Sequence, residues 1–188
     1  MEIKLGTDVL ESIQFLWKLE DEELIGWPID FETSRPARPQ LIGMESNPRK
    51  VELETFDASS WFENSIEEYE KHKFYEFGID GTGSGFCLWY YPDLNKIPPV
   101  VFWGSDGEFH FVAGSIQDFI KQLSSGKLFF SGSWLEPEDD EIEELDWNKL
   151  RSVTESHLGK WVEKPEELTV KGRLDHPDFE GWVNENWE

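Results

Sequence analysis

Apolar side chains in the middle of the chain follow a strand pattern before they follow a helix pattern. Residues 74 to 80 and 85 to 91 are two aromatic-rich runs separated by Gly-Thr-Gly-Ser, and glycine supplies the positive φ that a tight reversal needs. We expect the two runs to pair as a β-hairpin. In the second run, bulky side chains point to both sides, which is typical of a strand at the centre of a sheet.

A second pair of apolar runs, residues 100 to 103 and 108 to 113, flanks a Gly-Ser-Asp-Gly turn and predicts a second hairpin. The pattern then becomes helical, with Ser115 as the expected N-cap and Asp118 near the positive end of the helix. The expected buried stripe is Ile116, Phe119, Ile120 and Leu123, and Gly126 is expected to end the helix.

These elements predict an α+β fold class. We expect a single domain in which helices pack on a central, mostly antiparallel sheet of about four to six strands. Residues 8 to 20 add a helix with an expected capping box of Asp8 and Glu11 and an apolar stripe of Val9, Leu10, Ile13, Leu16 and Trp17. Four prolines between residues 27 and 50 permit only loops or short strands there. Three further elements are expected: a strand over residues 51 to 56, a helix from Ser60 to about Lys73, and a helix from about Trp147 to His157.

The composition indicates a folded protein. With 188 residues the chain can bury a sizeable core, and its 28 aromatic residues supply the apolar area that disordered chains lack. We divide it into an α+β part, residues 1 to 130, and an acidic C-terminal extension, residues 131 to 188, packed on the same domain. The single cysteine, Cys87, cannot form an internal disulfide. Because the N-terminus is too acidic for a signal peptide and no apolar run spans a bilayer, we expect a cytoplasmic location.

The formal charge of −23, from 40 acidic and 17 basic residues, narrows the range of partners. A field of this sign repels phosphate backbones and anionic lipids, so we expect no direct binding of nucleic acid or membrane. Between residues 136 and 146, eight of the eleven positions are acidic. We predict that this block binds a basic protein, because complementary potential speeds association; a solvated or disordered loop is the alternative. The predicted partner-binding residues are Glu136, Glu138, Asp139, Asp140, Glu141, Glu143, Glu144 and Asp146.

Residue types suited to catalysis do not fall into a recognisable motif. The stretch from Gly81 to Gly85 lacks both the G-x-G-x-x-G spacing and the following helix of a dinucleotide site, so we interpret it as a hairpin turn. Cys87 has apolar neighbours, which favours burial over thiol catalysis. Scattered histidines are typical of surface or half-buried positions, and here they are His72, His110, His157 and His176. We therefore predict no catalytic residue, no cofactor and no metal site, and a monomer or weak dimer.

The order of these motifs resembles that of the SUKH superfamily, which contains bacterial immunity proteins and fungal regulators of cell-wall glucan synthesis. The matching positions are the Gly81 to Gly85 turn, Val100 to Trp103, and Ser115 with Phe119 and Ile120, within about 50 of the 188 residues. Trp27 to Phe31 is a distant counterpart of the family's Leu-Pro-x-x-Tyr-like segment. The resemblance implies an α+β domain without enzymatic activity that binds a protein, often a secreted toxin that acts on nucleic acids.

The leading hypothesis is a non-enzymatic, protein-binding immunity protein that neutralises a cognate bacterial toxin, such as a basic nuclease, through its acidic surface. A scaffold or regulatory protein of a cell-wall or signalling pathway is the alternative that the fungal branch of the resemblance implies. A carboxylate-based hydrolase with a Trp-lined sugar cleft is a third hypothesis, motivated by the ten tryptophans.

Overall fold

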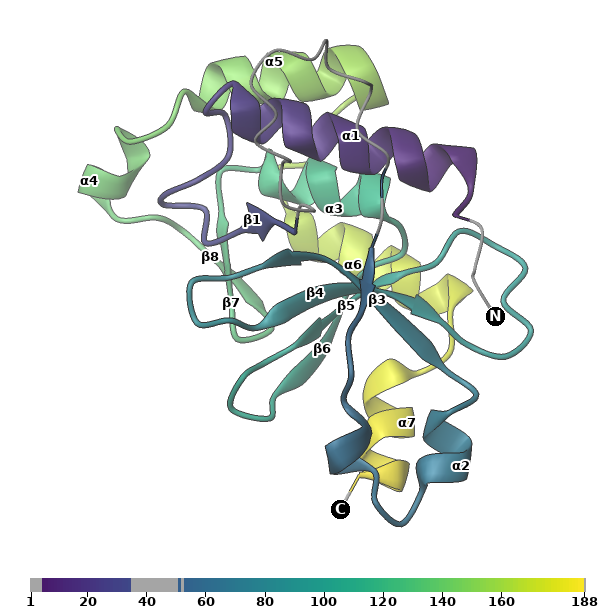
Figure 1. Ribbon diagram of the computed structural model, residues 1–188. Coiled ribbons are helices and arrows are strands. Elements are labelled where there is room, and N and C mark those ends of the chain that lie inside the picture. The colour runs from purple at the N-terminus through teal and green to yellow at the C-terminus, as the bar shows by residue number, and fades with distance from the viewer. Residues whose placement is uncertain (1–4, 35–50, 52, 188) are drawn as a thin grey trace, which may run out of the picture.

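The computed structural model describes residues 5–34, 51 and 53–187, which form one α+β domain (Figure 1). The described helices are α1 Thr7–Asp21, the 3-10 helix η1 Ser59–Trp61, α2 Ile66–Tyr69, α3 Ile116–Leu123, α4 Asp139–Ile142, α5 Trp147–Leu158, α6 Pro165–Asp175 and α7 Phe179–Asn186. The described strands are β1 Glu32–Thr33, β2 Glu54–Thr55, β3 Lys73–Ile79, β4 Gly85–Tyr90, β5 Val100–Trp103, β6 Phe109–Ala113, β7 Leu128–Phe130 and β8 Ser133–Leu135. The predicted fold class is confirmed.

Six strands form an antiparallel sheet in the order β1-β3-β4-β5-β6, and β2 also pairs with β3. Both predicted hairpins are present, because β3 pairs with β4 and β5 pairs with β6. Gly83 in the first turn has a φ of +84°, the conformation that glycine adopts without strain. β4 lies at the centre, between β3 and β5, as its bulky residues on both faces predicted.

Each face of the sheet carries an apolar core, because successive side chains of β4 point to opposite sides. Phe86 and Leu88 belong to the first core, which α1 and α3 cover. Cys87 and Trp89 belong to the second core, which α2 and α7 cover at the other side of the sheet. All four side chains are almost completely buried, so helices on both faces exclude water from the central strand.

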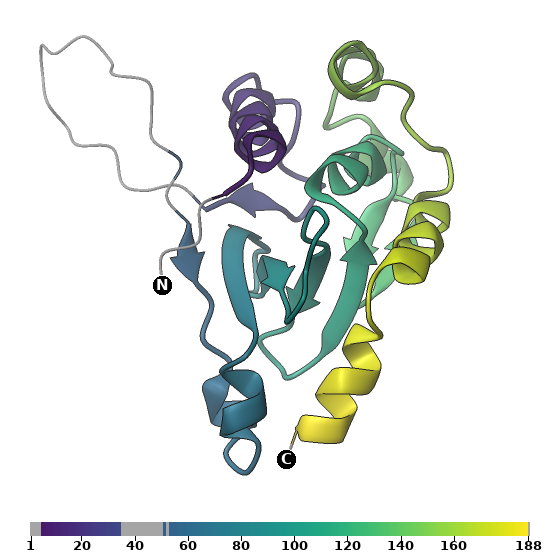
Figure 2. The same ribbon diagram turned by 90° about the vertical axis from the view of Figure 1, so that its right-hand side faces the viewer.

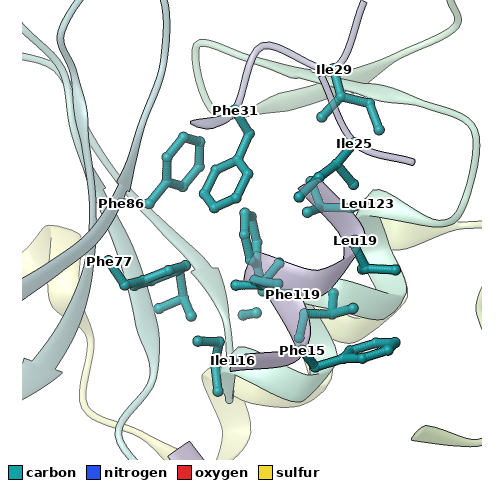
Figure 3. Packing of buried hydrophobic residues seen from close by; sticks show 14 of the residues in the cluster. Phe15, Leu19, Ile25, Ile29, Phe31, Phe77, Phe86, Ile116, Phe119 and Leu123 are labelled. Atoms are coloured by element: carbon teal, nitrogen blue, oxygen red, sulfur yellow. The ribbon is translucent and has the colours of Figure 1, made fainter. Parts of the chain in front are cut away.

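Phe119 of α3 lies at the centre of the first core (Figure 3). Its ring centroid lies 5.2 Å from those of Phe31 and Phe86 and 5.6 Å from that of Phe77. The N-terminus of α3 is capped by Ser115, whose side chain accepts a hydrogen bond of 3.0 Å from the N–H of residue 118, as predicted. The predicted stripe of Ile116, Phe119, Ile120 and Leu123 is buried. Capping and burial thus fix α3 on the sheet together.

The second core consists largely of stacked aromatic rings. Trp103 of β5 is fully buried, and its ring centroid lies 5.2 Å from that of Phe74 in an edge contact. Trp187 stacks on Trp61, with ring centroids 5.0 Å apart and an interplanar angle of 13°. The C-terminal segment and the segment before β3 therefore close this face of the sheet together.

His72 is buried in the second core beside two indole rings. Its ring stacks on that of Trp182 at 4.1 Å, and its Nδ1 accepts a hydrogen bond of 2.8 Å from Nε1 of Trp89. A carboxylate oxygen of Glu68 lies 3.8 Å from its Nε2. Because burial disfavours the imidazolium form, the pKa of His72 is lowered from 6.5 to about 4. A surface or half-buried histidine was expected here; the aromatic residues of distant segments bury it instead.

The edge strand β6 is covered by the two C-terminal helices, which run beside it in yellow (Figure 2). A carboxylate oxygen of Glu180 in α7 accepts a hydrogen bond of 2.8 Å from the N–H of Phe111. The hydroxyl of Thr169 in α6 donates one of 2.6 Å to the carbonyl of Val112. Unpaired backbone groups at a sheet edge invite another chain to pair there, so α6 and α7 occupy groups that would otherwise be open. Neither helix is among the elements expected from the sequence.

Helix α1 begins before its predicted cap. The N–H of Leu10 donates a hydrogen bond of 3.0 Å to the carbonyl of Gly6, which makes Gly6 the N-cap. The predicted capping box of Asp8 and Glu11 is therefore wrong. Asp8 lies within the first turn instead, where its carboxylate still interacts favourably with the positive end of the helix.

The helix predicted from Ser60 to Lys73 is replaced by η1 and the short helix α2. The hydroxyl of Tyr69 accepts a hydrogen bond of 2.9 Å from the N–H of Ala58, whereas a continuous helix would separate these residues by about 16 Å. The contact of the buried tyrosine with Ala58 thus requires the segment to fold back. The strand predicted over residues 51 to 56 is also shorter, since β2 is the only strand among the described residues of this range.

Other expectations concern the flanks of the sheet. Helix α5 confirms the helix predicted from about Trp147 to His157. β1 is a short strand, as the prolines after residue 27 predicted, while residues 35 to 50 lie outside the described residues. The hairpin of β7 and β8 spans both sides of the boundary that we placed at residue 130, and that boundary stays a prediction.

Replacement of Gly172 by alanine is expected to destabilise the fold. An added Cβ at Gly172 would lie 2.5 Å from the backbone nitrogen of Gly114, where α6 meets the end of β6. At a solvent-exposed position inside a helix, replacement of glycine by alanine stabilises the helix by about 1 kcal/mol. Here we expect overpacking to lower the free energy of unfolding by about 1 to 3 kcal/mol, measured by urea denaturation.

The matched control for this substitution is Leu174→Ala in the same helix. Leu174 is 84% exposed, so its truncation should change the unfolding free energy by no more than about 0.5 kcal/mol. A Gly172→Ala variant as stable as the wild type would contradict the close packing of α6 on β6.

Protonation of His72 is expected to favour unfolding at mildly acidic pH. The unfolded chain takes up this proton near pH 6.5 and the folded chain only near pH 4. The contribution of His72 to stability is therefore complete above pH 6.5 and is lost as the pH falls toward 4, by up to about 3 kcal/mol. His72→Asn keeps an acceptor near the position of Nδ1 but does not titrate, so its unfolding free energy should fall less steeply over this range.

Chemical denaturation at several pH values measures this difference. The slopes of wild type and His72→Asn should differ by about 1 kcal/mol per pH unit between pH 4.5 and 6. His157→Asn, at an exposed position on α5 where the imidazole stacks on Phe15 with ring centroids 4.0 Å apart, serves as the control for removing a histidine ring that packs on an aromatic residue. Parallel pH profiles for the wild type and His72→Asn would show that the buried imidazole does not have the inferred linkage.

Candidate functional site

The acidic block follows β8 and continues through α4 to the start of α5. In Figure 1, α4 lies at the margin of the molecule, away from the sheet. Seven of the eight predicted acids are exposed and Glu141 is half-buried. The structure therefore brings the predicted residues together on one surface segment, which we call the acidic segment, residues 136–146. Whether a partner binds it stays a prediction.

Several of these acids also organise the backbone of the segment. The side chain of Glu141 accepts a hydrogen bond of 2.7 Å from the N–H of Glu138 at the start of α4. Asp146 caps α5 through a hydrogen bond of 2.9 Å from the N–H of Lys149. These contacts satisfy N–H groups that a helix start leaves without partners. The acidic segment is thus an ordered structure in which two of the carboxylates accept hydrogen bonds from backbone N–H groups at helix starts.

A groove of about 420 Å³ opens between the acidic segment and the end of α3. One side is formed by Glu136, Pro137, Ile142, Leu145 and Asp146, and the other includes Ser125, Gly126 and Arg151. Ile142 is 47% exposed although its neighbours are acids. The groove therefore combines an apolar wall with carboxylates at its margin, and its volume falls near the lower end of the range for ligand pockets.

Arg151 of α5 contributes the positive charge of the groove, but its guanidinium is already engaged. Nε and Nη2 donate hydrogen bonds of 3.2 and 2.8 Å to the carbonyls of Ser124 and Ser125. The guanidinium also lies 4.5 Å from the centre of the Trp161 ring, a cation–π distance. Arg151 thus ties α5 to the end of α3 and to the segment before α6, and it shapes the groove from inside the fold.

The apolar wall is fixed by a tryptophan. Nε1 of Trp147 donates a hydrogen bond of 3.0 Å to the carbonyl of Ile142, so the end of α4 is held to the start of α5. Trp147 itself is only 8% exposed. The sequence pattern identified the acids of this site but missed Arg151, Ser125 and Gly126, which come from other elements. Ile142 and Leu145 were the available signal, because apolar residues are unexpected in a purely solvated acidic run.

The glycine-rich turn has no free amide cradle for an anion. Oδ1 of Asp80 accepts hydrogen bonds from the N–H groups of Thr82 and Ser84, at 2.9 and 2.8 Å. The N–H of Gly81 donates to the side chain of Asp30 at 2.7 Å. The protein's own carboxylates occupy the donors that a phosphate would need, so the hairpin interpretation of Gly81 to Gly85 holds.

The remaining candidate groups lie apart from the groove. Cys87 is completely buried, as predicted, and burial raises the pKa of its thiol well above the usual value. His176 lies beside β6, where Nε2 is 3.0 Å from the carbonyl of Gly114. Among the described residues, no group of three or more His, Cys, Asp or Glu side chains is arranged to hold a metal ion.

Comparison with known proteins identifies no family for this chain. Neither a protein family model, nor a curated protein, nor a solved structure matches this chain. Within the ranges that the structure describes, no helix has the length and apolar character needed to cross a bilayer. The functional interpretation therefore rests on the geometry of the acidic segment and its groove.

Proposed function

We propose that this chain is a protein-binding module without enzymatic activity, and that it acts as an immunity protein that neutralises a basic toxin domain. The observation that carries the proposal is the acidic segment, whose carboxylates are exposed and ordered at one margin of a chain with a formal charge of −23. An ordered surface loses less conformational entropy on binding than a mobile loop does. Its negative potential attracts a basic partner and repels an acidic one.

The nature of the partner follows from charge. A toxin that cleaves or modifies nucleic acid needs Lys and Arg side chains to hold phosphates. An acidic protein that covers such a surface competes directly with the nucleic acid. The stretch from Lys127 to Lys149 has no basic residue between its ends. This part of the surface therefore presents uninterrupted negative charge to a basic partner.

The resemblance to the SUKH superfamily supports the same proposal. The three matching stretches form a turn between β3 and β4, the strand β5, and the Ser115-capped helix α3. These elements make up the scaffold, whereas the acidic segment lies after them in the chain. In this proposal the sheet and α3 provide the fold, and the segment past residue 130 provides the contact with the partner.

Catalysis by carboxylates is a weaker proposal for the same groove. A carboxyl group that acts as a general acid near neutral pH needs an environment that excludes water. The side chain of Glu136 is 77% exposed, and five of the described tryptophans pack against one another or nearby rings in the second core. Exposed carboxylates are better suited to attracting a cation than to donating a proton.

Co-expression tests the proposed function. We expect the chain to restore growth of cells that produce a toxin domain encoded beside its gene, and to form a complex with that domain. A variant with Asp139→Asn, Asp140→Asn, Glu143→Gln and Glu144→Gln should slow association by about tenfold or more. The wild-type rate should also fall as NaCl is raised, because salt screens exposed charges.

The control variant neutralises four exposed acids on other helices: Glu11→Gln, Glu155→Gln, Glu167→Gln and Glu185→Gln. It has the same net charge as the first variant, so equal effects of the two variants would mean that net charge, not the acidic segment, determines binding. The absence of both a complex and protection with every adjacent toxin domain would refute the proposed function.

A further inference from the structure

The groove beside α4 has features that point to one kind of occupant. Its margin carries Glu136 and Asp146, and its wall is formed in part by Ile142 and Leu145. A long basic side chain matches this combination, because its aliphatic stem covers apolar surface while its charged end reaches polar groups. Its volume of about 420 Å³ is sufficient for a single long side chain.

One carboxylate at the margin already holds a cation from this chain. Nζ of Lys127 lies 3.1 Å from Oε1 of Glu136 and 3.9 Å from a carboxylate oxygen of Glu166. Oε2 of Glu136 accepts no hydrogen bond from any described residue. Glu136 thus keeps one oxygen for a second cation, and Lys127 retains Glu166 as a partner if Glu136 is engaged.

The second carboxylate at the margin, Asp146, can also accept a further cation. Oδ1 of Asp146 accepts the N–H of Lys149, while Nζ of Lys149 lies 3.9 Å from Glu22 and not at Asp146. Within the described part of the chain, Asp146 forms no ion pair. Asp146 therefore lines the groove without a cation, at a position that the start of α5 fixes.

Among the described residues, Arg151 adds a positive charge to the groove lining but forms no ion pair with Glu136 or Asp146. Its guanidinium is directed to the carbonyls of Ser124 and Ser125 and to the Trp161 ring. Glu136 and Asp146 therefore each keep a carboxylate oxygen for a further cation at a concave, partly apolar site. A concave site that one side chain can fill is the usual location of the strongest contacts in a protein interface.

We propose that the groove receives a single arginine side chain of the protein partner, with its stem against Ile142 and Leu145 and its guanidinium between Glu136 and Asp146. Arginine fits better than lysine because its planar guanidinium is less strongly hydrated and pairs with carboxylates through two hydrogen bonds. The inference rests on the proposed function, since it names the residue of the partner that the acidic segment recognises.

NMR titration with acetyl-arginine amide tests the groove without the partner. We expect saturable shifts of the Trp147 and Trp161 indole N–H signals, smaller shifts with acetyl-lysine amide, and none with the uncharged acetyl-citrulline amide. A double variant, Glu136→Gln with Asp146→Asn, should weaken arginine amide binding at least about tenfold. Asparagine is also a good N-cap, so α5 should remain intact, and the spectrum of the variant checks this.

The matched control is Asp139→Asn with Asp140→Asn, which removes the same charge from α4 outside the groove lining. It should retain binding within about twofold or threefold, as expected for exposed charges. Equal weakening by both double variants, or equal binding of citrulline amide, would overturn the proposal. So would arginine amide shifts confined to other indole signals.

The two proposals fail in different ways. If arginine amide binds the groove but no adjacent toxin domain is bound or neutralised, the immunity function fails and the arginine site stands. If a toxin domain is neutralised equally well by the wild type and by the Glu136→Gln, Asp146→Asn variant, the function stands and the arginine site fails.

Discussion

The backbone groups at the open edge of β6 impose a constraint on which the rest of this structure depends. A strand edge that is left unpaired attracts other chains, and here side chains of three helices satisfy its donors and acceptors instead. Glu180 accepts the N–H of Phe111, while Gln122 and Thr169 donate to the carbonyl of Val112. Because two of these helices come from the C-terminal third of the chain, the sheet is complete only when that third has folded onto it.

The route from α3 to these helices determines where the candidate site lies. After α3 the chain forms the hairpin of β7 and β8, then α4 and α5, before α6 reaches β6. The acidic segment is therefore part of the connection between α3 and α6. Arg151, which follows it in α5, bonds back to the end of α3. The acidic segment is held in place by helix caps and by Trp147, and not by a core of its own. Its acids consequently remain at the surface while its backbone is ordered.

Local patterns predicted the sheet and α3 because their signals are local: alternation in the strands, glycines in the turns and the Ser115 cap. Helix α6 lacks such a signal, since it buries Gly172 against β6 and leaves Leu174 in solvent, the reverse of an amphipathic pattern. The burial of His72 depends on Trp182, more than 100 positions later in the chain. For the site, composition identified the acids, but the groove required the contact of Arg151 with the end of α3.

The two kinds of carboxylate in the acidic segment differ in how freely they can change over evolution. Glu141 and Asp146 hold the starts of α4 and α5, so their replacement affects the local backbone as well as the charge. Asp139, Asp140 and Glu143 are exposed. Their side chains enter no hydrogen bond or ion pair with the described residues. A lineage can alter them without loss of fold. The segment thus separates carboxylates that support the backbone from carboxylates that do not, which would allow recognition to diverge while the domain stays the same.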